Sequence, residues 1–222
     1  MMTYKMKLKI FSLISKFFYF FGFQIFYSKK EIFPKNLNIK KIIDVGVANG
    51  TEILLKNYPN AKYYLIEPNE SFFKIIENQI LKKYKGKLFK CGADKFNGFK
   101  KLFIYGVSSS FYKRKNIKYN TYKKIRVFKL DTLLKNEKIS KDTLLKIDTE
   151  GNELNILKGS TKILKKINYL MLEVRLKNIE TYNPSELISF CHKYKFFWNK
   201  VLEIYYVKNG ISYFDLLLIK KK

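Results

Sequence analysis

The alternation of strand-like and helix-like segments is the feature that most constrains how this chain folds. The run Ile42-Ile43-Asp44-Val45 is typical of a buried strand, and a glycine turn and a helix to about residue 58 follow it. The same order returns in a strand over residues 61–67 with a helix over 71–84, and in a strand over 143–147 with a helix to about 165. Strands that alternate with helices form a mostly parallel sheet covered on both faces. The chain therefore predicts an α/β fold.

The remaining segments predict how this sheet is completed. Further strand patterns occur at residues 87–91, 100–105, 124–129 and 169–174, a helix at 184–194, and closing strands at 201–207 and 213–219. No helix separates the two closing strands, so we expect a hairpin that gives the sheet an antiparallel C-terminal edge strand. A chain of 222 residues suits one domain and is short for two. We expect that domain over residues 39–222, with a β-rich insertion near 98–130.

Residues 1–38 predict a separate helical segment. Three early lysines precede an apolar run over residues 10–27 that Lys16 interrupts, and no small-residue cleavage site follows this run. A lysine near the middle is costly for a membrane-spanning helix. Two interpretations stay open: an interfacial helix on an anionic membrane, and a helix that packs on the domain. We expect a cytoplasmic protein, attached peripherally at the inner face of the membrane if the first interpretation holds.

The net charge of +27 raises the question of a nucleic-acid partner. Of the 45 basic residues only Arg114, Arg126 and Arg175 are arginine, the side chain that bonds bases and phosphates bidentately. The lysines are spread along almost the whole chain, beside abundant Ile, Asn, Phe and Tyr, as in proteins from AT-rich genomes. We therefore expect no specific nucleic-acid partner. The two cysteines, Cys91 and Cys191, match no disulfide or metal framework and predict free thiols.

Candidate cofactor residues follow the first three strands, where open α/β sheets bind ligands. The first strand ends in Asp44 and a turn that contains Gly46, Ala48, Asn49 and Gly50. Glu67 follows the second strand about twenty residues later, the position at which nucleoside-binding folds carry an acceptor for ribose hydroxyls. A surface glutamate is the alternative. Asp94 follows the third strand and either accepts the adenine amino group or caps a turn.

Candidate reaction residues follow the next two strands of the core. Asp148, Glu150 and Glu153 lie within six residues after the strand at 143–147. Acids favour the first turn of a helix, which accounts for Glu150 or Glu153 better than for Asp148. Glu173 ends an otherwise apolar strand, and a lone acid there needs a partner or a task. We expect Asp148 and Glu173 to lie close together if their strands are neighbours.

These motifs, in this order and spacing between residues 42 and 174, resemble the FkbM family of methyltransferases. The residues that carry the resemblance are Asp44-Val45-Gly46-Val47-Ala48-Asn49-Gly50-Thr51, Tyr64-Leu65-Ile66-Glu67-Pro68-Asn69, Leu130-Asp131-Thr132-Leu133-Leu134, Lys146-Ile147-Asp148-Thr149-Glu150-Gly151-Asn152-Glu153 and Leu172-Glu173-Val174. The resemblance implies a Rossmann-like class I methyltransferase fold and transfer of a methyl group from S-adenosylmethionine, commonly to a hydroxyl of a glycan or another small molecule. It gives Asp44, Gly46, Gly50 and Glu67 cofactor roles and places Asp148 and Glu150 at the reaction end. Ala48 departs from the glycine that many class I enzymes carry.

The chemistry of methyl transfer to a hydroxyl suggests a general base. We hypothesise that Asp148 accepts the hydroxyl proton, with Glu150 and Glu173 as alternates. A second arrangement has Asp148 and Glu173 bind Mg²⁺, but two carboxylates are too small a ligand set for us to assign metal residues. His192 is the only histidine. It lies in the helix predicted at residues 184–194, and this position favours a role on the helix surface over a catalytic one.

Two other functions compete with this interpretation. A nucleic-acid methyltransferase that acts on base amines would carry an Asn/Asp-Pro-Pro-aromatic element after the fourth strand, where this chain has Asp148-Thr149-Glu150-Gly151. A non-catalytic protein that docks on membranes through its lysines would not need the full set of carboxylates. The sequence does not name the acceptor beyond a small molecule or glycan.

Overall fold

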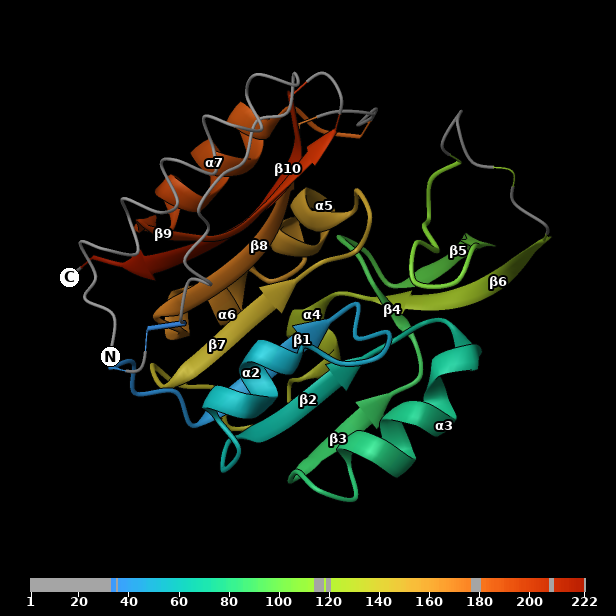
Figure 1. The fold of residues 1–222 in the computed structure, drawn as a ribbon, viewed down its shortest axis with the longest axis horizontal. Coiled ribbons are helices and arrows are strands. Elements are labelled where there is room, and N and C mark those ends of the chain that lie inside the picture. Colours follow the sequence, from blue (N-terminus) through green and yellow to red (C-terminus); the bar gives the residue numbers. More distant parts are fainter. Residues whose placement is uncertain are drawn as a thin grey trace, which may run out of the picture. The chain divides into compact units, whose positions relative to one another are not determined.

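A seven-stranded sheet forms the centre of the computed structural model (Figure 1). Its order is β3-β2-β1-β7-β8-β10-β9, and β10 runs antiparallel to both of its neighbours while the pairs from β3 to β8 are parallel. The α/β prediction and its antiparallel C-terminal strand are confirmed, with β9 outside β10 at the edge. The bounds are β1 Lys41–Val45, β2 Lys62–Ile66, β3 Gly86–Phe89, β7 Thr143–Ile147, β8 Tyr169–Arg175, β9 Phe196–Val207 and β10 Gly210–Lys220.

The structure describes residues 33–34, 36–113, 118, 121–176, 181–207 and 210–221. Phe33–Lys222 forms one compact unit, so the domain begins before the predicted start at residue 39. Phe33 is fully buried, and its ring meets the ring of Tyr58 edge-on at 5.7 Å. The N-terminal helical segment predicted from the sequence lies, up to residue 32, outside the described residues.

Helices cover both faces of the sheet (Figure 1). Leu54, Phe72 and Ile76 join the apolar cluster on one face, and Leu157, Leu164 and Leu187 join the cluster on the other. Burial of these faces is the main force that holds helices to sheet. The helical segments are α2 Glu52–Asn57, a 3-10 turn Glu70–Phe72, α3 Phe73–Ile75, a wider π-type turn Ile76–Ile80, α4 Leu130–Leu133, α5 Glu153–Lys158, α6 Thr161–Lys166 and α7 Pro184–Lys193.

The helix predicted to run to about residue 165 is two helices, α5 and α6, separated at Gly159 and Ser160. A Cβ at Gly159 would lie 2.1 Å from the carbonyl oxygen of Asp94, so only glycine fits this close approach. The periodic pattern of apolar residues continues through the break, which is why the sequence predicted one helix. The short elements α4 and β4 were not predicted.

A three-stranded sheet, β4-β6-β5, follows the carboxyl end of β3 on the right of Figure 1. It consists of β4 Gly92–Ala93, β5 Gly98–Ile104 and β6 Thr121–Phe128. Strands β5 and β6 pair antiparallel, and they form the β-rich stretch predicted near 98–130. This small sheet therefore stands at the end of the main sheet where the candidate site residues lie.

Both cysteines are buried and free, as predicted, and burial raises the pKa of the Cys91 thiol to about 11. Among the helices of the described chain, none combines the length and hydrophobicity needed to cross a bilayer. The apolar run at residues 10–27 is not in that part.

Candidate active site

The turn after β1 is wound tightly enough to require glycine. Gly46 and Gly50 have φ angles of +81° and +96°, in the left-handed region that glycine adopts without strain. A Cβ at Gly46 would lie 1.9 Å from the carbonyl oxygen of Asp148. Ala48 has φ +45°, which explains why glycine is common at this position in class I enzymes. Gly46 therefore lets the turn pack directly against the loop after β7.

Glu67, at the end of β2, joins this turn to the next one. Its carboxylate accepts hydrogen bonds from the backbone N–H of Ala48 at 2.9 Å and of Asn69 at 2.8 Å. Burial raises the pKa of Glu67, and these two donors oppose that shift. Each carboxylate oxygen has a second acceptor site. The side chain is therefore fixed in place with capacity left for hydroxyl donors, such as those of a ribose.

Asp44 faces the interior beneath the same turn. It accepts a hydrogen bond from the Thr51 hydroxyl at 2.8 Å and forms an ion pair with Lys146 at 3.2 Å. Burial raises the pKa of Asp44, against the opposing effects of Lys146 and Thr51. In this conformation Asp44 connects the turn, through Thr51, to Lys146 of β7.

Lys146 is the functional residue that the sequence reasoning missed, because it was noted only as part of a motif. Its ammonium contacts the carboxylates of Asp44 at 3.2 Å and Asp148 at 3.3 Å and donates to the carbonyl of Gly46 at 3.2 Å. Burial opposes its charge, but the two carboxylates outweigh burial and raise its pKa. The available signal was a charged residue inside the apolar run Leu144-Leu145-Lys146-Ile147, the same signal that singled out Glu173.

Asp148 is the most open carboxylate of the predicted reaction residues. Its side chain is 37% exposed, whereas those of Glu150 and Glu173 are 13% and 7% exposed. Its backbone N–H donates to the carbonyl of Val45 at 3.0 Å, which extends the pairing of β1 and β7 by one step. Asp148 therefore stands at the carboxyl end of the sheet with its carboxylate accessible.

Glu150 and Glu173 share one cation, Arg175. The guanidinium lies 2.5 Å from Glu150 and 2.6 Å from Glu173, and 4.9 Å from the centre of the Tyr213 ring. Burial, reinforced by the charge of Asp148, raises the pKa of Glu173 well above its usual range despite Arg175. Strands β7 and β8 are neighbours, so Asp148 and Glu173 lie close together as predicted. Arg175 was the second residue that the sequence reasoning did not assign.

Glu153 shapes the loop that carries Asp148 and Glu150. Its carboxylate is fully buried and accepts hydrogen bonds from the backbone N–H of Thr149 and Gly151, at 3.0 and 3.1 Å. Glu150 has φ +57° and Gly151 has φ +106°, two successive left-handed residues. Such backbone persists only where its surroundings enforce it. Glu153 supplies that constraint, which agrees with the helix-start interpretation of this acid.

Asp94 holds the small sheet to the reaction loop. Its buried carboxylate pairs with Lys100 at 2.9 Å and accepts from the Asn152 amide at 3.2 Å and the Lys95 N–H at 2.7 Å. These partners favour the turn-capping alternative for Asp94 over contact with adenine. The Ser110 hydroxyl adds a second link, because it donates to the Glu150 carbonyl at 2.9 Å.

Asp215 was not predicted and extends the row of acids. It lies on β10 directly opposite Glu173. Burial and the neighbouring charge of Asp148 raise its pKa to about 7, although Lys146 opposes the shift. The sequence showed only one acid in a closing strand, without the register that places it beside Glu173.

The described residues contain no group of three or more His, Cys, Asp or Glu side chains arranged to hold a metal ion. We therefore derive no step through Mg²⁺. His192 lies in the last turn of α7, an exposed helix position as predicted.

Comparison with solved structures defines the class of this fold. Methyltransferase FkbM from Methylobacillus flagellatus superposes with a TM-score of 0.52 at 14% identity, covering 81% of this chain and 44% of that one. Fibrillarin from Aeropyrum pernix, solved with natively bound S-adenosyl-L-methionine, gives a TM-score of 0.50 at 8% identity over 84% of this chain and 69% of that one. The fold is that of Rossmann-like class I methyltransferases.

The sequence narrows this class to one family. Residues 44–197 match the family described as the methyltransferase FkbM domain, and the chain belongs to this family of S-adenosylmethionine-dependent methyltransferases. A hexuronic acid methyltransferase from Haloferax volcanii is 34% identical over 50 residues, which are 22% of this chain and 21% of that protein. The chain thus aligns with about a fifth of this curated relative and less than half of the solved family member.

Proposed function

We propose that this protein transfers a methyl group from S-adenosylmethionine to a hydroxyl of a sugar or polysaccharide precursor. The observation that carries the proposal is the difference among the carboxylates at the reaction end. Asp148 is accessible, while Glu150 and Glu173 are held by Arg175. Arg175 occupies carboxylate oxygens of both glutamates and both are nearly covered, so neither can approach an acceptor hydroxyl as freely as Asp148. Asp148 is therefore the group that accepts the hydroxyl proton.

The cofactor supplies a methyl group on a positively charged sulfur. The turn of Gly46, Ala48, Asn49 and Gly50 binds it through bare backbone, and the Glu67 carboxylate accepts the ribose hydroxyls. Asp44 acts from beneath the turn through Thr51 and Lys146. Because the sheet fixes these groups relative to Asp148, the acceptor oxygen is aligned with the methyl carbon before reaction.

Transfer itself is an in-line displacement. When bound, S-adenosylmethionine would supply the methyl group by giving it up from sulfur to the acceptor oxygen, and Asp148 would take the hydroxyl proton of the acceptor. The Lys146 ammonium lies 3.3 Å from the Asp148 carboxylate and holds that side chain in position. The alignment with a hexuronic acid methyltransferase supports a sugar as the acceptor.

The test is transfer of labelled methyl groups into an extract of the cells that make this protein. We expect the label in material that glycosidases degrade and nucleases do not. Asp148→Asn should lower transfer by about 10²-fold or more while S-adenosylhomocysteine still binds. Asp142→Asn is the matched control, because Asp142 precedes the other end of β7 and also pairs with a lysine, Lys41, at 3.1 Å.

Nuclease-sensitive label would replace this function with nucleic-acid methylation. Full transfer by Asp148→Asn would remove Asp148 from the mechanism.

A further inference from the structure

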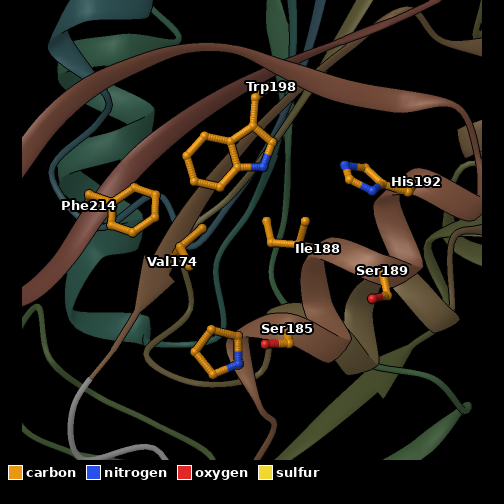
Figure 2. A pocket seen from close by; sticks show the side chains of 8 residues that line it. Val174, Ser185, Ile188, Ser189, His192, Trp198 and Phe214 are labelled. Atoms are coloured by element: carbon orange, nitrogen blue, oxygen red, sulfur yellow. The ribbon is translucent and has the colours of Figure 1, made fainter.

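A cavity of about 350 Å³ opens beside α7 (Figure 2). None of the carboxylates of the candidate active site is among its lining residues. Helix α7 forms one wall, and strands β8, β9 and β10 contribute the rest. Its volume is in the range of small-molecule sites, which combine apolar walls with a few polar groups. The lining residues that the argument uses are Ile188, Ser185, Ser189, His192, Trp198 and Phe214.

The aromatic wall of this pocket is Trp198. Its indole is 51% exposed and packs at 45° against the ring of Phe214, with 5.9 Å between ring centres. A tryptophan that is half exposed contributes less hydrophobic stabilisation than a tryptophan buried in the core. Trp198 and His192 are the only tryptophan and the only histidine of the chain, and both line this pocket. The abundance of lysine, phenylalanine and tyrosine in the chain therefore does not explain why Trp198 and His192 occur together in this pocket.

The polar wall is one face of α7. Ser185, Ser189 and His192 are spaced by four and three residues, so they lie on the same side of the helix. All three side chains are exposed. Within the described chain, their hydroxyl and imidazole groups form no side-chain hydrogen bond. The pocket thus offers hydrogen-bonding groups opposite an open indole.

We propose that this pocket binds a pyranose ring of a glycan. A pyranose has an apolar face of C–H groups that fits against an indole, and a rim of hydroxyls that both donate and accept hydrogen bonds. Serine hydroxyls also donate and accept, and the imidazole of His192 adds a further hydrogen-bonding group, so the polar wall matches this rim. An alkyl chain would leave the polar wall without partners, and a phosphate-bearing ligand would find no arginine or lysine among the lining residues.

The position of the pocket relates it to the acceptor. Val174 of the pocket lies near the carboxyl end of β8, and its side chain points to the face of the sheet opposite to those of Glu173 and Arg175. Thr181, shortly before α7, donates to the Gly151 carbonyl of the reaction loop at 2.6 Å. We assign the pocket as a subsite for a ring of the acceptor chain other than the methylated ring. This assignment rests on the proposed glycan acceptor.

The single tryptophan gives a direct test, because its fluorescence reports on this pocket alone. We expect a saturable change in tryptophan emission when the full chain is titrated with a neutral tetrasaccharide or with a tetramer of hexuronic acids. His192→Ala and Ser189→Ala should each weaken this binding about 2- to 10-fold, the effect of one net hydrogen bond. Lys193→Ala is the matched control, since Lys193 follows His192 in α7, is exposed and does not line the pocket.

The outcomes separate this proposal from the proposed function. No saturable change with either tetrasaccharide, or equal effects of His192→Ala and Lys193→Ala, overturns the pyranose subsite even if Asp148-dependent methyl transfer to a glycan is observed. A change produced only by an alkyl chain or by a short oligonucleotide also overturns it. Sugar binding together with nuclease-sensitive methyl transfer would instead retain the pocket and reject the glycan acceptor.

Discussion

Lys146 and Arg175 lie near the carboxyl ends of neighbouring strands of the same sheet, and each is a cation between two carboxylates. Lys146 is buried, whereas the Arg175 side chain is 13% exposed. Lys146 bridges Asp44 and Asp148 at 3.2 and 3.3 Å. Arg175 bridges Glu150 and Glu173 at 2.5 and 2.6 Å. The lysine also donates to the Gly46 carbonyl, which the planar guanidinium does not reach. A compact ammonium suits partners on several sides, and a guanidinium suits two carboxylates in its plane.

The two clusters differ in what they connect. The Lys146 cluster joins the cofactor turn to Asp148 and leaves that carboxylate 37% exposed. The Arg175 cluster joins two acids of the reaction end and leaves both nearly covered. If the proposed function holds, Lys146 links the cofactor half of the site to the reaction half, while Arg175 holds the acids on the acceptor side. The predictions below separate these roles.

The largest effect should come from Lys146→Met. Removing the ammonium leaves Asp44 buried without its countercharge, so the free energy of unfolding should fall by about 3–5 kcal/mol. Urea unfolding followed by circular dichroism measures this loss. The control is Lys162→Met, which removes an exposed lysine and should change stability by less than about 0.5 kcal/mol. Equal losses in the two variants would mean that the Lys146 cluster contributes no specific stability.

Arg175→Met should cost less stability and act on the acceptor instead. The side chains of Arg175 and Glu150 are each 13% exposed to water. We therefore expect the free energy of unfolding to fall by about 2–3 kcal/mol, which is below the range for fully buried pairs. Binding of S-adenosylhomocysteine should be unchanged, and the KM for the acceptor should rise. Arg175→Lys should not restore the KM, because an ammonium cannot pair with both carboxylates in the guanidinium plane. Weakened cofactor binding would contradict the division of roles.

The sequence predicted the parts of the site that local motifs encode. The glycine turn, Glu67 and Asp148 each follow a strand whose apolar run ends in a recognisable pattern, and the ends of parallel strands meet at one edge. The alternation of strands and helices could be predicted for the same reason. The break between α5 and α6 at Gly159 could not be predicted, because it depends on a close approach to Asp94, which is far away in the sequence.

Apart from the proximity of Asp148 and Glu173, contacts between side chains of neighbouring strands could not be predicted for the same reason. Lys146 pairs with Asp44 because β1 lies beside β7, and Asp215 faces Glu173 because β10 returns against β8. Composition offered no signal for either contact in a chain with so many lysines. Arg175, one of three arginines, was the exception that scarcity could have pointed out.

Glu67→Ala tests the cofactor half alone. The variant leaves the ribose hydroxyls and the N–H groups of Ala48 and Asn69 without an acceptor, so S-adenosylhomocysteine should bind about 1–3 kcal/mol more weakly by calorimetry. Glu70→Ala is the control, because Glu70 is exposed on the turn that follows and pairs with Lys123. Equal affinity of the Glu67 and Glu70 variants would show that Glu67 does not contact the cofactor.

Asp215→Asn should have little effect at low pH, an effect that grows as the pH rises, and it reports the charge balance between the two clusters. The pKa of Asp215 is raised to about 7 by burial and by Asp148, so the folded carboxyl keeps its proton where the unfolded carboxyl, with a pKa near 4, has lost it. Between these values the folded state binds more protons, and this group therefore makes the parent protein less stable as the pH rises. Asparagine cannot ionise. The stability of the variant relative to the parent should increase by about 2–3 kcal/mol from about pH 5 to about pH 8, measured by urea unfolding at each pH. A difference that stays constant with pH would mean that Lys146 compensates Asp215 fully, and that its charge belongs to the Lys146 cluster.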